Sequence, residues 1–165
     1  MLYFDGRPIL KFDCHDRSAL EVMFRSGISL RATQLLGRGG ATTYWRVTRL
    51  AGFLPNLGGW FFRHVVMFAN FAWKGKVTGC NCFFRSKYWP WGRFEVDDQV
   101  AYAGDGGQAV LLDHGQPSNC WWSSRRLRYY LRTTGDPCLL LGKCCASFFG
   151  REIFLGYFVL TRLGG

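Results

Sequence analysis

The sequence has few of the residues from which catalytic and metal sites are usually built. Only three of its 165 residues are histidine, and no two of them are four positions apart. The zinc patterns C-x-x-C and H-E-x-x-H and the hydrolase pattern G-x-S-x-G are also missing. The glycine-rich segment 37–40 lacks the Lys-Ser/Thr pair of a phosphate-binding loop, and a strand pattern follows it instead of a helix. We therefore predict no metal ion, no cofactor and no catalytic residue.

The cysteines do not form the pattern of a disulfide framework. There are seven of them, an odd number, and the start of the chain lacks the basic and apolar regions of a signal peptide. Neither Cys80-Asn-Cys82 nor the pair Cys144-Cys145 has the spacing of a structural zinc site. We expect reduced thiols that fill space as small apolar side chains in an intracellular, cytoplasmic protein.

Long uncharged apolar runs are missing as well. The most apolar segment, 56–72, has hydrophobic residues at helical spacing, but Arg63 and His64 interrupt it before it could cross a membrane. We predict a buried helix over 56–72 that packs on a sheet or closes the opening of a barrel. His64 is then either a core histidine with satisfied ring nitrogens or a group in a pocket.

Aromatic residues and glycines, by contrast, are abundant. Phe, Trp and Tyr make up 18% of the chain, glycine occurs 21 times and charged residues are 19%. This composition is typical of a folded, β-rich protein, and the length suits one domain spanning 1–165. The net charge of +10 fits nucleic acid, an anionic membrane or an acidic ligand as partner, and equally a basic, solvated surface.

Strand patterns separated by turn residues occupy most of the sequence. Ser18 and Glu21 form a capping box, which predicts a short helix over 18–26. Strands are predicted over 42–50, 73–84, 93–103, 107–114, 121–133, 137–148 and 152–162, with turns such as 89–92 and 104–107 between them. Short links without helices imply an antiparallel meander. We therefore predict a mainly β, up-and-down barrel of about seven or eight strands, wide enough for one small ligand.

The last two predicted strands are apolar on both faces. Strict alternation over 152–162 places Ile153, Leu155, Tyr157 and Val159 on one face and Phe154, Phe158 and Leu160 on the other. Two apolar faces imply that each one is covered, and the predicted helix 56–72 is the cover that we expect. In contrast, we expect Asp113 and His114 to be a solvated polar pair, because they end a strand before a turn.

Arginines and aromatic residues alternate over 121–132. If the segment is a strand, Arg126, Arg128, Tyr130 and Arg132 share one face, opposite Leu127, Tyr129 and Leu131. The arginine face could bind single-stranded nucleic acid, it could be the wet face of a barrel strand, or it could point inward and hold an acid group.

The order of several short motifs resembles that of lipocalin-like, calycin-type barrel domains. The matching elements are W-x-G-K at Trp73–Lys76, an L-x-L-G element within Leu139–Lys143, and Y-F-x-L-x-R within Gly156–Arg162. The G-x-W-x-G element of the first strand is not intact, since the chain reads GRGGATTYWR from Gly37 to Arg46. The resemblance implies an antiparallel barrel with an apolar cavity over roughly residues 55–163.

Three functional hypotheses follow from these patterns. The first is noncatalytic binding of a small hydrophobic or amphipathic ligand, such as a lipid, terpenoid or tetrapyrrole, in the barrel. The predicted pocket residues are Trp60, Phe61, His64, Phe68, Trp73, Tyr129, Tyr157 and Val159, with Arg128 or Lys143 at an acid group of the ligand. The second is an isomerase, cyclase or hydrolase that uses His64 with Asp113 or Asp98 in the same cavity. The third is binding of nucleic acid or an anionic surface through Arg125–Arg132.

Overall fold

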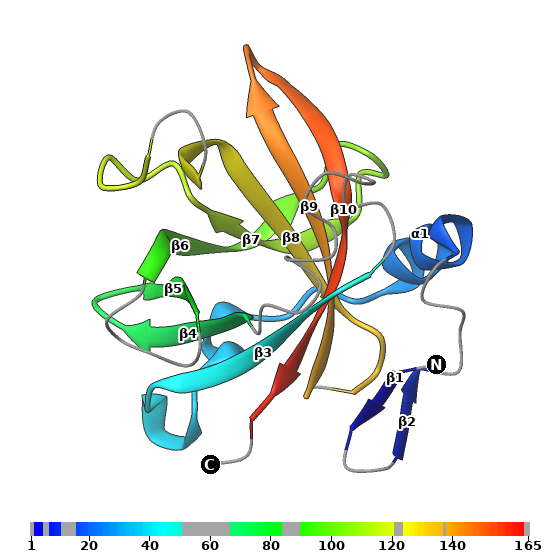
Figure 1. Cartoon of the computed structure of the whole chain (residues 1–165), viewed down its shortest axis with the longest axis horizontal. Coiled ribbons are helices and arrows are strands. Elements are labelled where there is room, and N and C mark those ends of the chain that lie inside the picture. Colours follow the sequence, from blue (N-terminus) through cyan, green and yellow to red (C-terminus); the bar gives the residue numbers. More distant parts are fainter. Residues whose placement is uncertain are drawn as a thin grey trace.

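The computed structural model describes residues 2–4, 7–10, 16–50, 67–83, 90–120, 124–136 and 138–163, and its main feature is a closed antiparallel barrel (Figure 1). The barrel strands are β3 (Thr43–Arg49), β4 (Met67–Trp73), β5 (Val77–Phe83), β6 (Pro90–Ala101), β7 (Gln108–Asp113), β8 (Leu127–Thr133), β9 (Leu139–Phe148) and β10 (Arg151–Arg162). Each strand pairs with the next, and β10 pairs with β3 to close the barrel. The predicted mainly β, up-and-down barrel is confirmed.

A second, two-stranded sheet lies outside the barrel ladder, where β1 (Leu2–Phe4) pairs with β2 (Arg7–Leu10).

The helix predicted over 18–26 is α1 (Arg17–Ser26). Its cap differs from the prediction, because the carboxylate of Asp16 accepts hydrogen bonds from the backbone N–H groups of Ser18 (2.8 Å) and Ala19 (3.3 Å). Asp16 therefore satisfies the first free amides, and Glu21 does not act as a capping residue. Within the described residues, three short 3-10 helices also occur: η1 (Ala32–Leu35), η2 (Arg38–Gly40) and η3 (Ser124–Arg126).

The helix predicted over 56–72 is wrong for the part that the structure describes, since Met67–Trp73 is strand β4; the remainder lies outside the described residues. Met67, Ala69 and Phe71 point into the barrel, and the residues between them point out. Because both faces of β4 carry apolar residues, the helical and the strand period fit the segment equally well. Two further boundaries differ: β6 includes Pro90–Gly92, which was expected to be a turn, and β8 begins only after η3.

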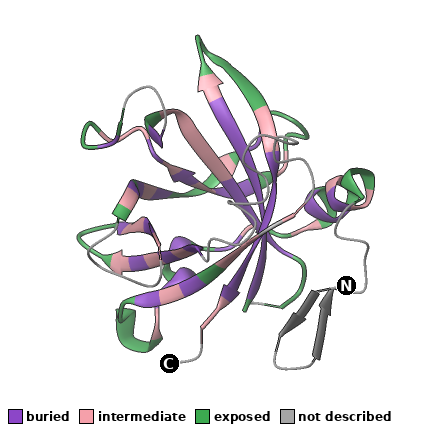
Figure 2. Cartoon of the chain, in the orientation of Figure 1, coloured by how far each residue is buried: buried purple, intermediate pink, exposed green. Residues whose placement is uncertain are grey.

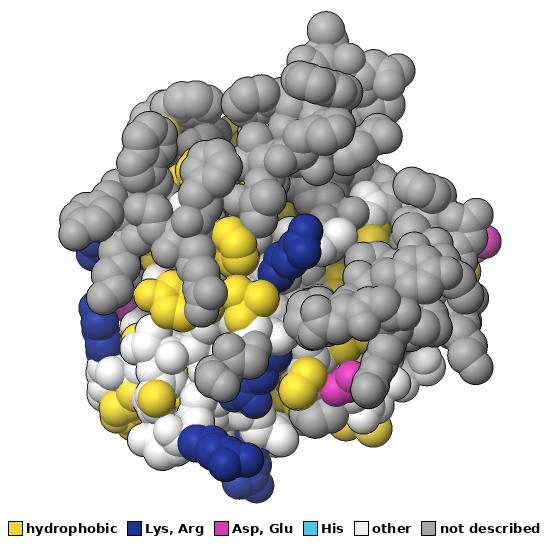
Figure 3. All heavy atoms as spheres, turned by 60° about the horizontal axis from the view of Figure 1, so that its bottom comes forward, with side chains coloured by type: hydrophobic (Ala, Val, Ile, Leu, Met, Phe, Trp, Pro, Cys, Tyr) yellow, Lys and Arg dark blue, Asp and Glu magenta, His cyan; other side chains and the backbone are white. Residues whose placement is uncertain are grey.

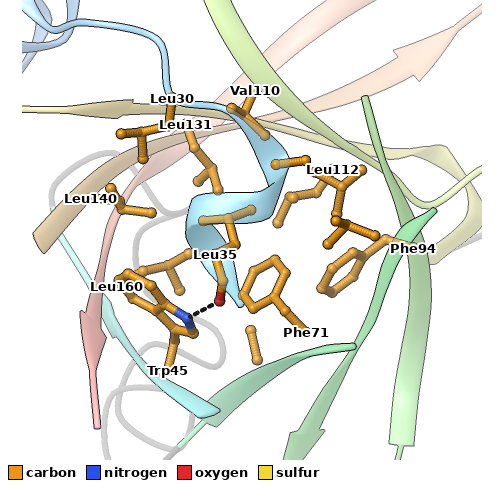
Figure 4. Close-up of a cluster of buried hydrophobic side chains, with 14 of the residues drawn as sticks. Leu30, Leu35, Trp45, Phe71, Phe94, Val110, Leu112, Leu131, Leu140 and Leu160 are labelled. Carbon is orange, nitrogen blue, oxygen red and sulfur yellow. Dashed lines mark hydrogen bonds between the residues drawn. The ribbon is translucent and has the colours of Figure 1, made fainter. Parts of the chain in front are cut away.

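The barrel interior is filled with apolar side chains from all eight strands (Figure 4), and the barrel strands carry many buried residues (Figure 2). Trp45 of β3 is completely buried there and contacts Phe71 in an edge-to-face arrangement, with ring centroids 6.3 Å apart. Leu35 of η1 lies in the middle of this cluster, and its carbonyl accepts a hydrogen bond of 3.1 Å from Trp45 Nε1 (Figure 4). The segment before β3 thus fills one part of the barrel.

A second apolar cluster lies on the outside of the barrel, beneath α1. Leu20, Met23 and Phe24 of the helix pack on outward-facing residues of neighbouring strands: Tyr102, Ala109, Tyr130, Leu139, Leu141, Cys145, Tyr157 and Val159. This cluster explains why β9 and β10 are apolar on both faces. Among the described residues, the cover on their outer face is α1, and the described part of the predicted helix 56–72 is strand β4 of the barrel itself.

Buried charges attach α1 to the barrel wall. Lys143 Nζ of β9 lies 2.7 Å from a carboxylate oxygen of Glu21 and over the Tyr102 ring, while its side chain is only 7% exposed. The hydroxyl of Tyr157 donates to the same carboxylate. Nearby, the Arg132 guanidinium pairs with Asp105 and donates a 3.0 Å hydrogen bond to the carbonyl of Phe24.

A bulge in β10 changes which residues face inward. The pairing shifts between Phe154 and Gly156, so that Phe154 and Tyr157 both lie in the outer cluster, while Leu155 packs on the inner one. The strict alternation predicted for 152–162 therefore fails at this point. Further along, the ring of Phe158 lies over Gly142 of β9, where an added Cβ would come 2.2 Å from it.

We predict that the Glu21–Lys143 pair makes the stability of the fold depend on acid pH. Burial alone would raise the pKa of Glu21, but hydrogen bonds from Lys143, Tyr157 and Arg25 lower it from 4.5 to about 2. The stabilisation is therefore complete above pH 4.5 and is lost as the pH falls from 4.5 towards 2. Glu21→Gln is expected to cost about 1–2 kcal/mol at neutral pH, since it leaves the Lys143 ammonium without its counter-charge.

The measurement is urea unfolding of both proteins across this pH range. The difference in unfolding free energy between wild type and Glu21→Gln should shrink as the pH falls. Glu95→Gln, which removes a surface pair with Lys76, is the matched control and should cost less than Glu21→Gln at neutral pH. A Glu21→Gln difference that stays constant down to pH 2 would contradict the account.

Candidate functional site in the barrel interior

The structure distributes the predicted pocket residues over both sides of the barrel wall. Tyr129 of β8 points inward and lines a small cavity. Phe68 lies on the outer face of β4, and Trp73 is at the end of that strand with 56% of its surface exposed. Tyr157 and Val159 belong to the outer cluster beneath α1. Trp60, Phe61 and His64 lie outside the described residues.

The two cations predicted to meet a ligand's acid group also face away from the interior. Arg128 is on the outer face of β8 and lies 2.8 Å from Asp113 of β7. Lys143 is the partner of Glu21 beneath α1. Arg128 and Lys143 face outward for the same reason. Side chains alternate between the two faces of a strand, and in β8 and β9 the inward positions are taken by Leu131, Leu140 and Cys144. Asp98, the other predicted acid, accepts a hydrogen bond from the backbone of Ala32.

A small cavity of about 30 Å³ lies inside the barrel. Its described lining consists of Val47, Met67, Ala69, Asn81, Leu112, Tyr129, Phe158 and Leu160. Asn81 is the polar side chain of this lining, and most of the rest of it is apolar. The volume suits one or two water molecules.

Asn81 belongs to a buried polar pair with His114. The Asn81 side-chain nitrogen and His114 Nε2 are 2.9 Å apart, and both side chains are almost completely buried. The imidazole packs against the rings of Phe94 and Tyr129, at centroid distances of 5.1 and 4.5 Å. Burial lowers the pKa of His114 to about 3, outweighing the backbone groups of Leu112 and Leu127, which favour the charged ring. The imidazole is therefore neutral at physiological pH.

Two polar atoms beside this pair have no partner. Neither His114 Nδ1 nor the Ser124 hydroxyl reaches a hydrogen-bond partner among the residues described. The two groups are close neighbours, because a Cβ at Gly92 would lie 3.2 Å from the His114 ring and 3.6 Å from Ser124 Cβ. Buried polar groups in native proteins are nearly always hydrogen-bonded, so unpaired atoms in an apolar interior indicate a place for water or a ligand.

The chain positions His114 through its backbone. The N–H of His114 donates to the carbonyl of Leu127 (3.3 Å), which continues the pairing of β7 with β8 beyond the last ladder residue. The carbonyl of His114 accepts a 2.6 Å hydrogen bond from the side chain of Asn119. These two bonds fix the residue after Asp113, so that its ring points into the barrel.

Sequence reasoning missed this pair, although a signal was present. We expected His114 to be solvated with Asp113 at the end of a strand. Val110 and Leu112 face inward, and every second residue of a strand lies on the same face. His114 is the next residue in this series, so the alternation of β7 predicts that its imidazole lies inside the barrel. No local pattern distinguishes Asn81, which is flanked by Cys80 and Cys82.

The chemistry available at the site is hydrogen bonding by neutral groups. On the outer side of the barrel wall, burial raises the pKa of the Cys82 and Cys145 thiols to about 11 and 12, so both are protonated at neutral pH and add no charge near the site. The six cysteines within the described ranges are free thiols. Within the same ranges, no group of three or more His, Cys, Asp and Glu residues could hold a metal ion.

The arginines of the 125–132 stretch are engaged with the protein itself. Arg128 and Arg132 pair with Asp113 and Asp105. Arg126 lies over the ring of Phe148, and Arg125 donates to a backbone carbonyl. Because their guanidinium groups already have partners, these residues offer fewer free donors to phosphate groups than the sequence pattern implies.

We predict that Asn81 and His114 are energetically coupled. Asn81→Leu removes the hydrogen-bond partner of Nε2 on a buried imidazole, which should cost about 1–3 kcal/mol of unfolding free energy. His114→Phe likewise leaves the Asn81 amide unpaired. The double variant replaces both polar groups by apolar ones, so it should lose clearly less than the sum of the two single losses. Urea unfolding of the four proteins measures the coupling, and additive losses would show that the two residues do not form a pair.

Two further findings concern the chain as a whole: its relation to membranes and its similarity to known proteins. In the parts of the chain that are described, no helix is both long enough and apolar enough to span a membrane. Neither a family model, nor a curated protein, nor a solved structure matches the chain.

Proposed function

We propose that this protein is a noncatalytic binding barrel for a small amphipathic ligand, which it holds in the barrel interior. The observation that supports this most is His114 Nδ1, which has no hydrogen-bond partner among the described residues and is buried beside Asn81 near a small, mostly apolar cavity. We also propose that the chain is a lipocalin-like domain, as the motifs at Trp73–Lys76 and Gly156–Arg162 suggest.

The lining determines the chemical class of the ligand. Leu112, Phe158 and Leu160 offer apolar contact, so most of the ligand should be hydrocarbon. His114 and Asn81 together offer a hydrogen bond at one end. The ligand should therefore carry one neutral hydroxyl or carbonyl group, because an ionised group would face a neutral imidazole in an apolar interior.

The volume limits the size of the ligand. About 30 Å³ holds water, so an organic molecule can enter only if side chains at the cavity move. Met67 is the most adaptable residue of the lining, since its unbranched thioether side chain has three rotatable bonds. This favours a ligand much smaller than a tetrapyrrole.

Binding without catalysis fits the protonation states of the interior groups. A general acid or base works best with a pKa near the operating pH, whereas burial holds the pKa of His114 near 3. The described carboxylates Asp113 and Asp98, which we considered as partners of a catalytic histidine, are bonded to Arg128 and to the backbone of Ala32.

We predict that the protein takes up primary alcohols in the series from ethanol to octanol. Affinity should rise with chain length, by up to about 0.8 kcal/mol for each CH₂ group buried, until the interior is full. The readout is the chemical shift of the amides of Asn81, Leu112 and Tyr129 in NMR titrations, with native mass spectrometry as a second measure.

Two variants make this test specific. In the double variant Asn81→Leu/His114→Phe the hydroxyl loses its partners, so the dissociation constants should rise about tenfold. The matched control is Asn70→Leu, on the outer face of the neighbouring strand β4, and it should change nothing in the interior. If no alcohol perturbs the interior amides, or if both variants bind as the wild type does, the proposed function is wrong.

A further inference from the structure

A row of side chains crosses the outer face of four neighbouring strands. Tyr44 of β3 pairs with Asn70 of β4, Asn70 with Cys80 of β5, and Cys80 with Arg93 of β6. Residues paired across strands point to the same side of the sheet, so these four side chains form a continuous floor. They face away from the interior cavity described above.

This floor belongs to a groove with a volume of about 440 Å³, which is the size of small-molecule sites. The loop after β7 forms one wall, through Gln116 and Ser118. The loop is held in place by Asn119, whose side-chain oxygen accepts from the N–H of Arg93 (2.8 Å) and whose nitrogen donates to the carbonyl of Arg93 (2.6 Å). The same residue therefore fixes both the wall and the backbone of Arg93.

The groove contains two cations without an acidic partner. Neither Arg93 nor Lys74 forms an ion pair within the described parts of the chain, and both are exposed. The acid that lines the groove, Glu95, is already neutralised by Lys76. Measured along the strand direction, Lys74 lies four residues beyond the row that contains Arg93, which is about 13 Å. Positive charge is therefore present towards both ends of the groove.

Neutral hydrogen-bonding side chains lie between these charges. They are Thr42, Asn70, Thr78, Gln116 and Ser118. None of the five makes a side-chain hydrogen bond to another described residue, so their donors and acceptors are available to a ligand. Burial raises the pKa of the Cys80 thiol, so the floor beneath them is uncharged.

We propose that this groove binds a phosphorylated, polyhydroxylated small molecule of the sugar-phosphate class. The planar fork of Arg93 suits a phosphate group, which it can bind with two parallel hydrogen bonds. The threonine, asparagine, glutamine and serine side chains suit hydroxyl groups of a sugar. The net charge of +10 adds long-range attraction for an anion, and on the face shown in Figure 3 the visible charged side chains are mostly Lys and Arg.

The test is an NMR titration of the full chain with three probes: glucose 6-phosphate, glucose and inorganic phosphate. Glucose 6-phosphate should shift the amides of Asn70, Cys80 and Arg93 and should bind at least about tenfold more tightly than either of the other probes. Binding of inorganic phosphate with equal affinity would overturn the sugar-phosphate assignment. The interior amides of Leu112 and Tyr129 should not move, which separates this result from that of the alcohol titration.

Two variants and one control locate the site. Arg93→Gln should raise the dissociation constant about tenfold or more without affecting folding, because the guanidinium has no partner in the described structure. Thr78→Trp fills the groove and should abolish binding. Arg151→Gln removes an exposed arginine at the start of β10, and it should leave the affinity within about twofold. An equal loss in Arg93→Gln and Arg151→Gln, or an absence of shifts at the floor of the groove, would overturn the proposal.

Discussion

Closure of the barrel by β10 is the constraint on which the other features depend. This strand pairs with β9 along one edge and with β3 along the other, which leaves no free edge in the eight-stranded sheet. Its last residue, Arg162, lies over the Trp45 ring with its guanidinium carbon 5.5 Å from the ring centroid, and it donates to the carbonyl of Leu36. Trp45 in turn binds the carbonyl of Leu35. The last strand, the first barrel strand and the segment before it are thus joined at one point.

Closure separates two apolar environments with different roles. The interior is packed around Trp45 and Leu35 and contains one polar pair, Asn81 and His114. The outer cluster attaches α1, and there the polar groups are charged and paired, as Lys143 with Glu21. Buried polar groups with complete hydrogen bonding fix a structure, whereas an incomplete set leaves capacity for a ligand. By this criterion the interior pair is the functional candidate, and the pair beneath α1 is structural.

The architecture could be predicted from the sequence because it depends on patterns that repeat over the chain. Turn residues and alternating strands identified the barrel, and the helix near Ser18 was predicted at the right place, although Asp16 and not Ser18 caps it. Two local predictions failed where a pattern is ambiguous. The segment that became β4 is apolar on both faces, so its period does not decide between helix and strand, and the bulge at Leu155 reverses the alternation in β10.

The positions of candidate site residues were harder to predict, because a shift of one residue moves a side chain through the barrel wall. We expected Tyr129, Tyr157, Val159 and Lys143 to face the cavity. The structure has Tyr129 in the cavity lining, whereas the other three side chains face α1 on the outside of the barrel. The outer groove could not be predicted, since its floor combines single residues from four strands that have no common motif. Only the pairing register of β3, β4, β5 and β6 brings Tyr44 and Arg93 into the same row.

The nitrogen chemical shifts of the His114 ring test the central claim most directly, because they report both its charge and its hydrogen bonding inside the barrel. The assignment can be made by comparison with His114→Phe. We expect a neutral ring that does not titrate until the pH approaches 3, and an Nδ1 shift that changes when an amphipathic ligand is taken up. A ring that titrates near its ordinary value of 6.5, or nitrogen shifts that no ligand changes, would contradict a buried histidine that serves a binding site.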